Sequence, residues 1–212
     1  MTSAVFVDYD GTITDLDTFD VLVRHYAGDA AWQAIEESLQ RGDVTLREAL
    51  QTEASLVRAA FDEACEVLER SVAFDPAFGD FVVDCERRGI AVTIVSSGVE
   101  PVIRRALERH WLGEVPVVAN GLEADPSGWR IRFRDELANG TDKAGLVRAA
   151  RERGEFTTYI GDGLSDYDAA LTADVVYAKR GRRLAHFLAG RGVPFTAFGN
   201  FAELMERRRA EA

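Results

Sequence analysis

Short apolar runs that end abruptly in polar loops recur along the chain. The first, AVFVD, runs into DYDGT, and the same pattern returns in IAVTIVSSG and TTYIGDG. Runs of this length, bounded by Gly, Ser and Asp, are typical of buried strands. We therefore predict strands at residues 4–8, 90–98 and 157–163, with weaker candidates at 115–121, 173–179 and 193–198.

Amphipathic helical patterns separate most of these strands. They cover residues 78–88, 99–111, 143–153, 165–171 and 182–189. Apolar strands that alternate with helices indicate a mostly parallel sheet covered on both faces. The predicted fold class is α/β, with a Rossmann-like, doubly wound and mostly parallel sheet.

One long stretch interrupts the alternation. Residues 17–72 show apolar positions at spacings of three and four, as at Ala49, Leu50 and Ala54, and hold no strong strand candidate. We predict a small all-helical cap at residues 15–74, inserted after the first strand into an α/β core of residues 1–14 and 75–212. The alternative is that these helices pack directly on the sheet.

A second irregular piece spans residues 121–135. Its latter half alternates, with Trp129, Ile131 and Phe133 on one side, and it contains the turn residues Asp-Pro-Ser-Gly. This pattern predicts a β-hairpin. We expect Trp129, like Trp32 and Trp111, to be a packing residue.

Composition and charge exclude several classes of protein. The 212 residues are 47% hydrophobic, as in ordinary soluble globular proteins. The net charge of −11 argues against a nucleic-acid partner. No run approaches the ~20 apolar residues of a membrane span, and the first residues lack a secretory pattern, so we expect a cytoplasmic protein without a membrane partner. Cys65 and Cys85 are expected to be buried, reduced thiols. A homodimer is left open.

Acidic residues follow two of the predicted strands. Asp8 and Asp10 follow the first strand, while Asp162, with Asp166 four residues later, follows the strand at 157–163. Ligands of open parallel sheets bind at the carboxyl ends of the strands, so these carboxylates are expected to converge. Their mutual repulsion calls for a hard cation, and carboxylate oxygens suit Mg²⁺. One carboxylate could then attack phosphorus, and another could transfer protons.

Each acidic motif has a simpler explanation when it stands alone. DYDGT could be a plain turn or a calcium loop, although Gly11 and Phe19 do not fit the positions that a helix-loop-helix calcium site requires. GDGLSD could be an acidic turn that caps the following helix. The convergence of both motifs at one edge is what favours a functional site.

The SSG sequence after the second predicted strand is a candidate phosphate site. Ser96 could donate its hydroxyl to a phosphate oxygen, and the backbone N–H groups of Ser97 and Gly98 would open the following helix, where anions bind well. The alternative is an ordinary serine helix cap.

Lys143 stands out because the chain uses arginine almost everywhere. Of 25 basic residues only Lys143 and Lys179 are lysine. Lys143 begins a predicted helix, where a positive charge opposes the helix dipole. A compact ammonium there could neutralise a transferring phosphoryl group and shield a nucleophilic carboxylate. Lys179 receives no predicted role.

Together the four motifs resemble those of the haloacid-dehalogenase-like phosphatase superfamily. DYDGT, IVSSG, Lys143 and GDGLSD occur in the family's order, from Asp8 to Asp166. The resemblance implies an Mg²⁺-dependent phosphatase. Carried over by position, the catalytic residues are Asp8 (nucleophile), Asp10 (general acid/base) and Lys143; the phosphate-binding residues are Ser96, Ser97, Gly98 and Lys143; and the metal residues are Asp8, Asp10 through its carbonyl, Asp162 and, in support, Asp166.

The helical insertion is similar to the cap of the phosphoserine-phosphatase-like branch. Phosphoserine phosphatases usually carry a glutamate nine residues after the nucleophile that helps hold the substrate amine; here Asp17 stands at that position. Together with PVVANGLE and VPFTAF, Asp17 looks more like the methionine-salvage phosphatases that act on 2-hydroxy-3-keto-5-methylthiopentenyl-1-phosphate. The candidate cap contacts to the substrate are Asp17, Phe19, Asp20 and Arg24.

We therefore expect hydrolysis of a small phosphorylated metabolite through an aspartyl-phosphate. Phosphoserine phosphatase or a related small-molecule phosphotransferase is the alternative in the same class. A non-catalytic module that binds Mg²⁺ and phosphate is the alternative in another class, but such a module would typically have lost Asp8 or Asp10, and both are present.

Overall fold

A single seven-stranded sheet forms the centre of the computed structural model, which describes residues 2–210. The strands lie in the order β4-β3-β2-β1-β5-β6-β7, and every neighbouring pair is parallel except the β3–β4 hairpin. Their bounds are β1 Ser3–Val7, β2 Ile90–Val99, β3 Val117–Glu123, β4 Arg130–Arg132, β5 Phe156–Gly161, β6 Val175–Lys179 and β7 Thr196–Phe198.

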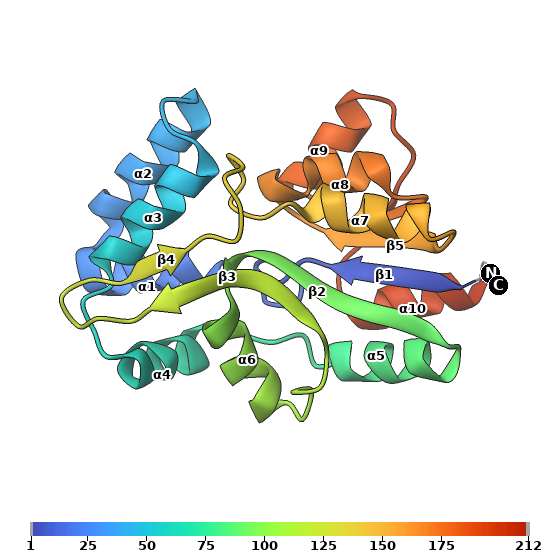
Figure 1. Cartoon of the computed structure of the whole chain (residues 1–212), viewed down its shortest axis with the longest axis horizontal. Helices are drawn as coiled ribbons and strands as arrows, with labels where there is room; N and C mark the ends of the chain where they lie inside the picture. Colours follow the sequence, from blue (N-terminus) through green and yellow to red (C-terminus); the bar gives the residue numbers. More distant parts are fainter. Residues whose placement is uncertain (1, 211–212) are drawn as a thin grey trace.

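Helices cover both faces of this sheet. In the view of Figure 1, α7, α8 and α9 lie above it, and α5, α6 and α10 lie below it. Their bounds are α5 Phe78–Arg87, α6 Glu100–Arg109, α7 Lys143–Glu152, α8 Tyr167–Thr172, α9 Arg183–Gly190 and α10 Phe201–Ala210, with a short 3₁₀ turn, η1 Leu164–Asp166, before α8. The arrangement confirms the predicted doubly wound α/β fold.

Strand β1 shows how the sequence builds the two layers. Its alternate residues point to opposite faces, so that Ala4 and Phe6 belong to one apolar cluster and Val5 and Val7 to the other. The first cluster packs on α7, α8 and α9, and the second packs on α5, α6 and α10. Because both faces of β1 are covered, the strand reads as a continuous apolar run rather than as an alternation.

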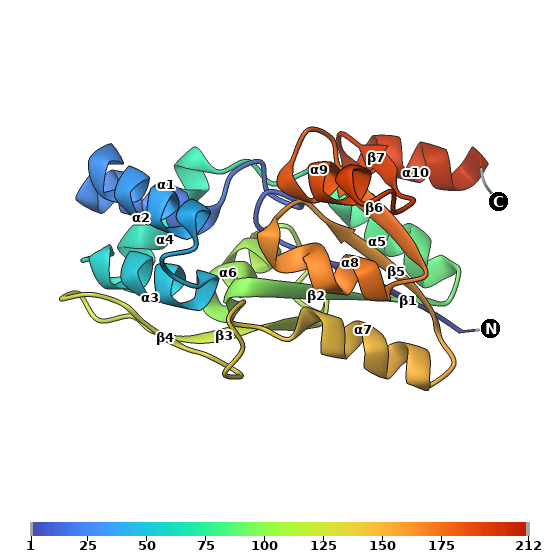
Figure 2. The ribbon, with the colours of Figure 1, turned by 90° about the horizontal axis from the view of Figure 1, so that it is seen from above.

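The stretch after β1 is helical, as predicted. It forms α1 Thr18–Ala27, α2 Asp29–Arg41, α3 Leu46–Leu56 and α4 Phe61–Ser71, which gather beside one end of the sheet (Figure 2). Phe19, Leu50 and Leu68 contribute to a third apolar cluster, apart from the two of the core. The cap helices therefore pack in an apolar cluster distinct from the two of the sheet, and this cluster also includes Val99 and Val102 of the core.

The predicted hairpin is present and packs against this cap. Leu122 pairs with Ile131 in the β3–β4 ladder. The backbone N–H of Trp129 donates to the carbonyl of Ala54 at 3.0 Å, and its indole N–H donates to the carbonyl of Ala59 at 2.9 Å. Trp129 is 1% exposed. The hairpin thus packs against the cap helices, although its strand β3 belongs to the sheet of the core.

The two segments that join cap and core lie side by side. Thr14 and Phe74 form an antiparallel bridge, the N–H of Asp15 donates to the carbonyl of Ala73 at 3.0 Å, and the N–H of Asp75 donates to that of Ile13 at 2.8 Å. These contacts support the predicted domain boundaries at residues 14–15 and 74–75, which remain a prediction.

Three smaller expectations have clear outcomes. Cys65 and Cys85 are buried and free, as predicted. The expectation for Trp111 is wrong: this residue lies just past α6 with a φ of 60° and is 95% exposed, because the chain reverses there. Among residues 2–210, no helix is both long and apolar enough to cross a membrane.

Candidate active site

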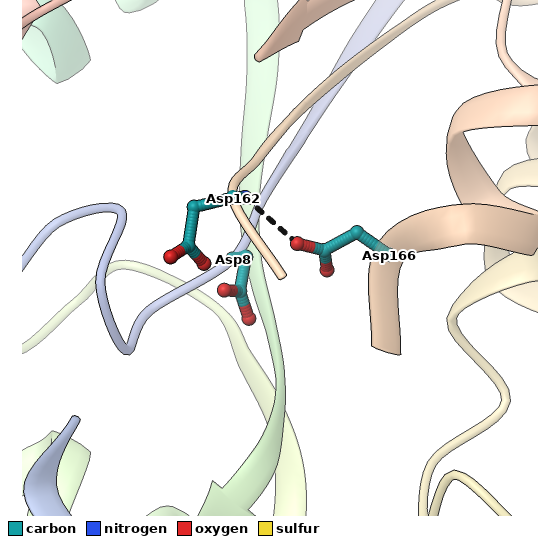
Figure 3. A group of neighbouring side chains, drawn as sticks. All are labelled: Asp8, Asp162 and Asp166. Carbon is teal, nitrogen blue, oxygen red and sulfur yellow. Dashed lines mark hydrogen bonds between the residues drawn. The ribbon is translucent and has the colours of Figure 1, made fainter. Parts of the chain in front are cut away.

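Three carboxylates meet beyond the carboxyl ends of β1 and β5. Asp8 follows β1, Asp162 follows β5, and Asp166 ends the short η1 turn (Figure 3). One oxygen from each of the three lies within 4.8 Å of the others. The structure therefore brings together three of the four predicted metal residues, from chain positions more than 150 residues apart.

Asp166 is held by hydrogen bonds on both oxygens. Its Oδ1 accepts from Lys143 Nζ at 2.8 Å and from the Tyr159 hydroxyl at 2.6 Å. Its Oδ2 accepts from the N–H groups of Asp162 and Gly163 at 2.8 and 2.9 Å. Asp166 is completely buried. Since four donors occupy its lone pairs, Asp166 is better suited to position its neighbours than to bind a cation directly.

Lys143 joins two of the carboxylates. It begins α7, is 2% exposed, and donates from Nζ to Asp8 Oδ1 at 2.6 Å and to Asp166 Oδ1 at 2.8 Å. Burial alone would lower the pKa of Lys143, but the charges of Asp166 and Asp8 raise it above its usual value. Lys143 therefore remains a fully charged ammonium beside Asp8.

This single ammonium does not neutralise the carboxylates around it. Burial, followed by the charges of neighbouring groups, raises the pKa of Asp8 well above its usual value. The pKa of Asp162 is raised to about 7, first by burial and then by Asp166. Uncompensated negative charge among hard oxygen donors is the environment that suits Mg²⁺. The residues present therefore fit a divalent cation held by Asp8 and Asp162.

The loop after Asp8 is shaped to let Asp162 approach. Gly11 has a φ of +71°, and a Cβ there would lie 2.3 Å from Asp162 Oδ2, so a side chain is excluded on both counts. The Thr12 hydroxyl lies 3.4 Å from both Asp8 Oδ2 and Asp162 Oδ1. Lys179 Nζ donates to the carbonyl of Thr12 at 2.9 Å, so this lysine, without a role in the sequence analysis, fixes the loop.

Asp10 is oriented by the first residue of helix α1. Thr18, which begins α1, donates both its backbone N–H and its hydroxyl to Asp10 Oδ1, at 2.9 and 2.7 Å. Burial raises the pKa of Asp10, and the contacts to Thr18 oppose that shift. The side chain of Asp10 is not one of the three clustered carboxylates. This separation fits a proton-transfer role for its carboxyl group.

The SSG segment lies at the site, but not as the sequence predicted. Strand β2 continues to Val99 with a shift of register between Val95 and Val99, and α6 begins only at Glu100. The N–H groups of Ser97 and Gly98 therefore belong to an irregular strand end rather than to the first turn of a helix. The N–H of Gly98 donates to Ser96 Oγ at 2.9 Å.

Ser97 nevertheless offers a free polar group. Its hydroxyl is buried and has no hydrogen-bond partner among the described residues, although Ser97 lines the cavity above Asp8. The side-chain amide of Asn120 donates to the carbonyl of Ser97 at 2.8 Å and so fixes this segment. The hydroxyl of Ser97 is therefore available to a phosphate oxygen.

A cavity of about 440 Å³ lies between these groups and the cap. From the core it is lined by Asp8, Asp10, Ser96–Gly98 and Asp162, and from the cap by both acidic and apolar residues. The acidic ones are Asp17, Asp20, Glu36 and Glu53, and the apolar ones include Phe19, Leu39, Leu46 and Leu50. The part of the cap that lines this cavity contains no lysine or arginine among the residues the structure describes.

These cap carboxylates are crowded together. Asp17 caps α1, since its Oδ1 accepts from the N–H groups of Phe19 and Asp20 at 2.8 and 3.2 Å. Burial, and then the charges of Asp10, Asp20 and Glu53, raise the pKa of Asp17 well above its usual value. Burial likewise raises the pKa of Glu53 to about 8, with a further contribution from Asp20. The cap side of the cavity is therefore a wall of carboxyl groups, of which Asp17 and Glu53 have no cationic partner and Glu36 pairs with Arg183 of the core.

The mouth of the cavity is bridged by an ion pair. Glu36 of α2 in the cap accepts from Arg183 of α9 in the core, and both line the cavity. Arg24, a predicted cap contact, does not line it: its guanidinium stacks 3.6 Å from the ring of Trp32 and lies 3.7 Å from Asp29. Arg24 therefore stabilises the cap from outside the cavity.

Several residues of the site were missed in the sequence analysis. Thr18 and Tyr159 donate to Asp10 and Asp166, and Glu53 and Arg183 line the cavity. Thr18, directly after Asp17 at a helix start, carries an ordinary capping signal that could not indicate a bond to Asp10. Tyr159 lies on β5 only two residues before the GDGLSD motif, but a strand tyrosine carries no signal of a bond to Asp166. Glu53 and Arg183 lie on helices far from the motifs, and only the packing of cap on core brings them to the cavity.

Comparisons with known proteins agree with this geometry. Residues 5–171 match the model of the family described as haloacid dehalogenase-like hydrolase. Pdp3-interacting factor 1 of Schizosaccharomyces pombe is 35% identical over 94% of this chain and 92% of that protein. The polyol phosphate phosphatase PYP1 of Saccharomyces cerevisiae is 28% identical over 96% and 91% of the two chains.

Two further similarities concern substrate and fold. A 2-hydroxy-3-keto-5-methylthiopentenyl-1-phosphate phosphatase of Microcystis aeruginosa is 27% identical over 97% of both chains. A substrate-bound phosphoserine phosphatase superposes with a TM-score of 0.75 at 17% identity, covering 98% of both chains. At that identity the superposition shows a shared fold.

Proposed function

The chain belongs to the haloacid dehalogenase-like hydrolase family and is a phosphatase, and from this premise we propose that it hydrolyses a small, hydroxyl-rich phosphate monoester through a phosphorylated Asp8. The strongest support is the position of Asp8. It lies at the base of the cavity, within 2.6 Å of a buried lysine and beside two further carboxylates.

Each predicted residue has a place in the reaction. A carboxylate oxygen of Asp8 attacks phosphorus, the bond to the ester oxygen breaks, and Asp10 gives its proton to the leaving oxygen. Asp10 then takes a proton from water as that water attacks the acyl phosphate, which releases inorganic phosphate and restores Asp8. Lys143, Ser96 and Ser97 bind the phosphoryl oxygens, and Lys143 remains charged throughout.

Mg²⁺ is the cation that this donor set fits. Asp8, Asp162 and the backbone carbonyl of Asp10 would hold it, and Asp166 would orient Asp162 through its N–H. When bound, the ion neutralises charge on the transferring phosphoryl group. The raised pKa values of Asp8 and Asp162 support this assignment because both carboxylates lack a sufficient counter-charge in the protein alone.

The cap wall favours a neutral, hydroxyl-bearing substrate. Asp17, Asp20 and Glu53 offer carboxylate oxygens, which accept hydrogen bonds from hydroxyl groups. A substrate carboxylate, such as that of phosphoserine, would face these groups with no cation from the cap; the arginines that line the cavity, Arg182 and Arg183, come from the core, and Arg183 already pairs with Glu36. The similarity to a polyol phosphate phosphatase supports the same class of substrate.

A second candidate is 2-hydroxy-3-keto-5-methylthiopentenyl-1-phosphate. Leu39, Leu46 and Leu50 line the cavity and would pack against an apolar methylthio end. Several relatives named for this substrate match nearly the whole chain. The expected cytoplasmic location, the absence of nucleic-acid and membrane partners and a homodimer remain predictions.

Phosphate release with and without Mg²⁺ tests the proposal. Wild type and Asp8→Asn are compared first on p-nitrophenyl phosphate, and wild type is then compared on glycerol 3-phosphate, sorbitol 6-phosphate, phosphoserine and the methylthiopentenyl phosphate. We expect turnover to require Mg²⁺ and to fall at least about 10⁴-fold in Asp8→Asn, as when a nucleophile is removed. We expect kcat/KM for a polyol phosphate to exceed that for phosphoserine at least about tenfold, or 1.4 kcal/mol.

The control is Asp29→Asn, which neutralises an exposed aspartate of the cap outside the cavity lining. This variant should behave as wild type. Activity that survives in Asp8→Asn, or that is unchanged by EDTA, would contradict the mechanism. A preference for phosphoserine would contradict the substrate class and leave the nucleophile assignment intact.

A further inference from the structure

A second cavity, of about 290 Å³, lies on the other side of the catalytic loop. Cap helix α4 and core helix α6 lie side by side below the sheet, and the cavity is found where these helices meet the two connecting segments (Figure 1). None of its lining residues lines the active-site cavity. Its walls are largely apolar, with Leu68, Val72, Phe74, Val102 and Ala106.

The inner end of this cavity presents an unpartnered hydroxyl. Tyr9, between Asp8 and Asp10, is 2% exposed and lines the cavity. Its phenol has no hydrogen-bond partner among residues 2–210, and burial, followed by the charges of Asp10 and Cys65, raises its pKa. A buried phenol usually finds a partner. The cavity reaches this hydroxyl, so water or a molecule bound there is within reach as its partner.

The outer end of the cavity carries two arginines, whose charges are balanced by Glu69 and Asp62 but whose N–H donors are not all used. Arg105 and Arg109 of α6 both donate to the single carboxylate of Glu69 on α4, and their side chains are 41% and 53% exposed. A guanidinium has five N–H donors, so most of these donors remain free after the bonds to Glu69. The rim therefore offers an anion two guanidinium groups at the edge of an apolar space.

We propose that this cavity is a second binding site, for a small molecule with an apolar body and one anionic group. The body fills the space between α4 and α6 and reaches the Tyr9 hydroxyl, and the anionic group binds Arg105 and Arg109. This second site goes beyond the proposed phosphatase function, because a molecule can bind there whether or not a substrate is being hydrolysed.

A molecule bound in this site would contact two residues that are linked to the catalytic loop. Tyr9 is the neighbour of both Asp8 and Asp10, and Thr18, which also lines the cavity, donates to the Asp10 carboxylate. An occupant also touches the cap through Leu68 and the core through Val102. Binding is therefore expected to lower kcat while KM stays unchanged, because the substrate cavity remains free.

The probe that tests the site is 8-anilinonaphthalene-1-sulfonate, which joins an aromatic body to one sulfonate and fluoresces when it is bound in apolar surroundings. The full chain is titrated with this probe in Mg²⁺ buffer, with and without saturating inorganic phosphate. Ala106→Phe fills the cavity from α6, Arg109→Gln removes a rim charge, and Ala34→Phe adds the same ring to an exposed position on α2 as the control.

We expect one saturable site per chain, unaffected by phosphate. The Kd should rise at least about tenfold in Ala106→Phe and about fivefold in Arg109→Gln, and it should stay within about twofold of wild type in Ala34→Phe. Displacement of the probe by phosphate, an unchanged Kd in Ala106→Phe and Arg109→Gln, or no binding to the folded wild type would each overturn the proposal. If Ala106→Phe does not fold, Arg109→Gln alone decides between the outcomes. Because binding is read without turnover, a failed phosphatase assay would leave this result unaffected.

Discussion

At the scale of single residues, the site depends on how each carboxylate is compensated. Asp166 has four donors, Asp10 has two from Thr18, and Asp8 has one short bond to Lys143 with a long contact to Thr12. Asp162 accepts only a 3.4 Å contact from Thr12, and of the other three Asp8, the one proposed to react, accepts the fewest short hydrogen bonds. A nucleophile needs an oxygen that is not held by strong donors, and Asp8 Oδ2 meets this condition.

Replacement of Lys143 should separate its role from that of an ordinary lysine. Lys143→Met leaves Asp8 and Asp166 buried without their shared cation, so we expect a loss of about 3–5 kcal/mol in the free energy of unfolding. Lys179→Met, at the only other lysine of the chain, removes a bond to one carbonyl and should cost about 1 kcal/mol. Urea denaturation without Mg²⁺ measures both, and equal losses would contradict the assignment.

Glu53 should make stability depend on pH. Its pKa is about 8 in the folded chain against an ordinary 4.5. Between these pH values Glu53 is ionised in the unfolded chain but keeps its proton in the folded chain. Its contribution to the free energy of unfolding is therefore complete below pH 4.5 and is lost as the pH rises through 8. Glu53→Gln keeps the neutral form at every pH. We expect it to match wild type near pH 4.5 and to exceed its unfolding free energy by about 2 kcal/mol near pH 8.5, since cavity water screens part of the shift.

Urea titrations at the two pH values in EDTA measure this difference. Asp84→Asn is a suitable control, because Asp84 pairs with Arg88 on α5, away from the cavity. Parallel pH profiles for wild type and Glu53→Gln would show that Glu53 is ionised in the folded chain across this range.

At the scale of the elements, α1 links the cap to the acid/base group. Thr18 begins the helix, and both of its donors reach Asp10. A cap helix that begins on the proposed acid/base side chain ties the position of the cap to the orientation of that side chain. The Asp10 carboxyl group is therefore best oriented when the cap is in the position that this structure shows.

Thr18→Val should expose this link. The variant loses the hydroxyl but keeps the backbone donor and the side-chain volume, so we expect kcat for an alkyl phosphate to fall about tenfold. Turnover of p-nitrophenyl phosphate should fall only about twofold, because its leaving group needs little help from an acid. Thr18→Ser, which keeps the hydroxyl, should retain most of the activity on both substrates. Equal losses on the two substrates in Thr18→Val would indicate a general structural defect instead.

Most elements could be predicted because their sequence patterns are local. Every strong strand candidate, the helical insertion and the hairpin were recovered, since apolar periodicity and turn residues report burial directly. The start of α6 was placed too early because the irregular strand end at Ser96–Gly98 depends on pairing with β3. Packing of Trp129 on the cap could not be predicted either, since its partners at Ala54 and Ala59 are some 70 residues away.

In the candidate site, too, the residues of local motifs could be predicted, and those brought in by packing could not. The four motifs correctly predicted the family. Their residues Asp8, Asp162, Asp166 and Lys143 lie together in the structure, as expected. The cap wall could not be predicted, because Glu53 is an ordinary glutamate of an amphipathic helix until the fold turns it toward the cavity. The roles of the individual site residues await the experiments above.

At the scale of the whole molecule, cap and core meet around the substrate cavity and are joined across its mouth by Glu36 and Arg183. A relative movement of the two parts would therefore change how widely the cavity opens to solvent. The pair is partly exposed, with side chains 23% and 46% accessible, so it is a weak link that salt can screen.

Arg183→Gln should therefore loosen the cap without unfolding it. We expect amide hydrogen exchange in α2 to accelerate about two- to fivefold, as for the loss of an exposed ion pair, with no change in the sheet. Arg153→Gln, which removes a pair with Glu155 on the core surface, is the control. Exchange in α2 that is the same in both variants would show that the pair does not hold the cap.

The paired connecting segments also bear on how the chain folds. Strands β1 and β2 are neighbours in the sheet, yet residues 8–89 separate them, so their pairing closes a long loop. The bonds between Asp15 and Ala73 bring the two ends of the cap together as soon as its helices assemble. An early-forming cap then shortens the effective loop about threefold, which lowers the entropic cost of pairing β1 with β2 by about 1 kcal/mol. The insertion that encloses the substrate in the finished enzyme would thus speed assembly of the sheet beneath it.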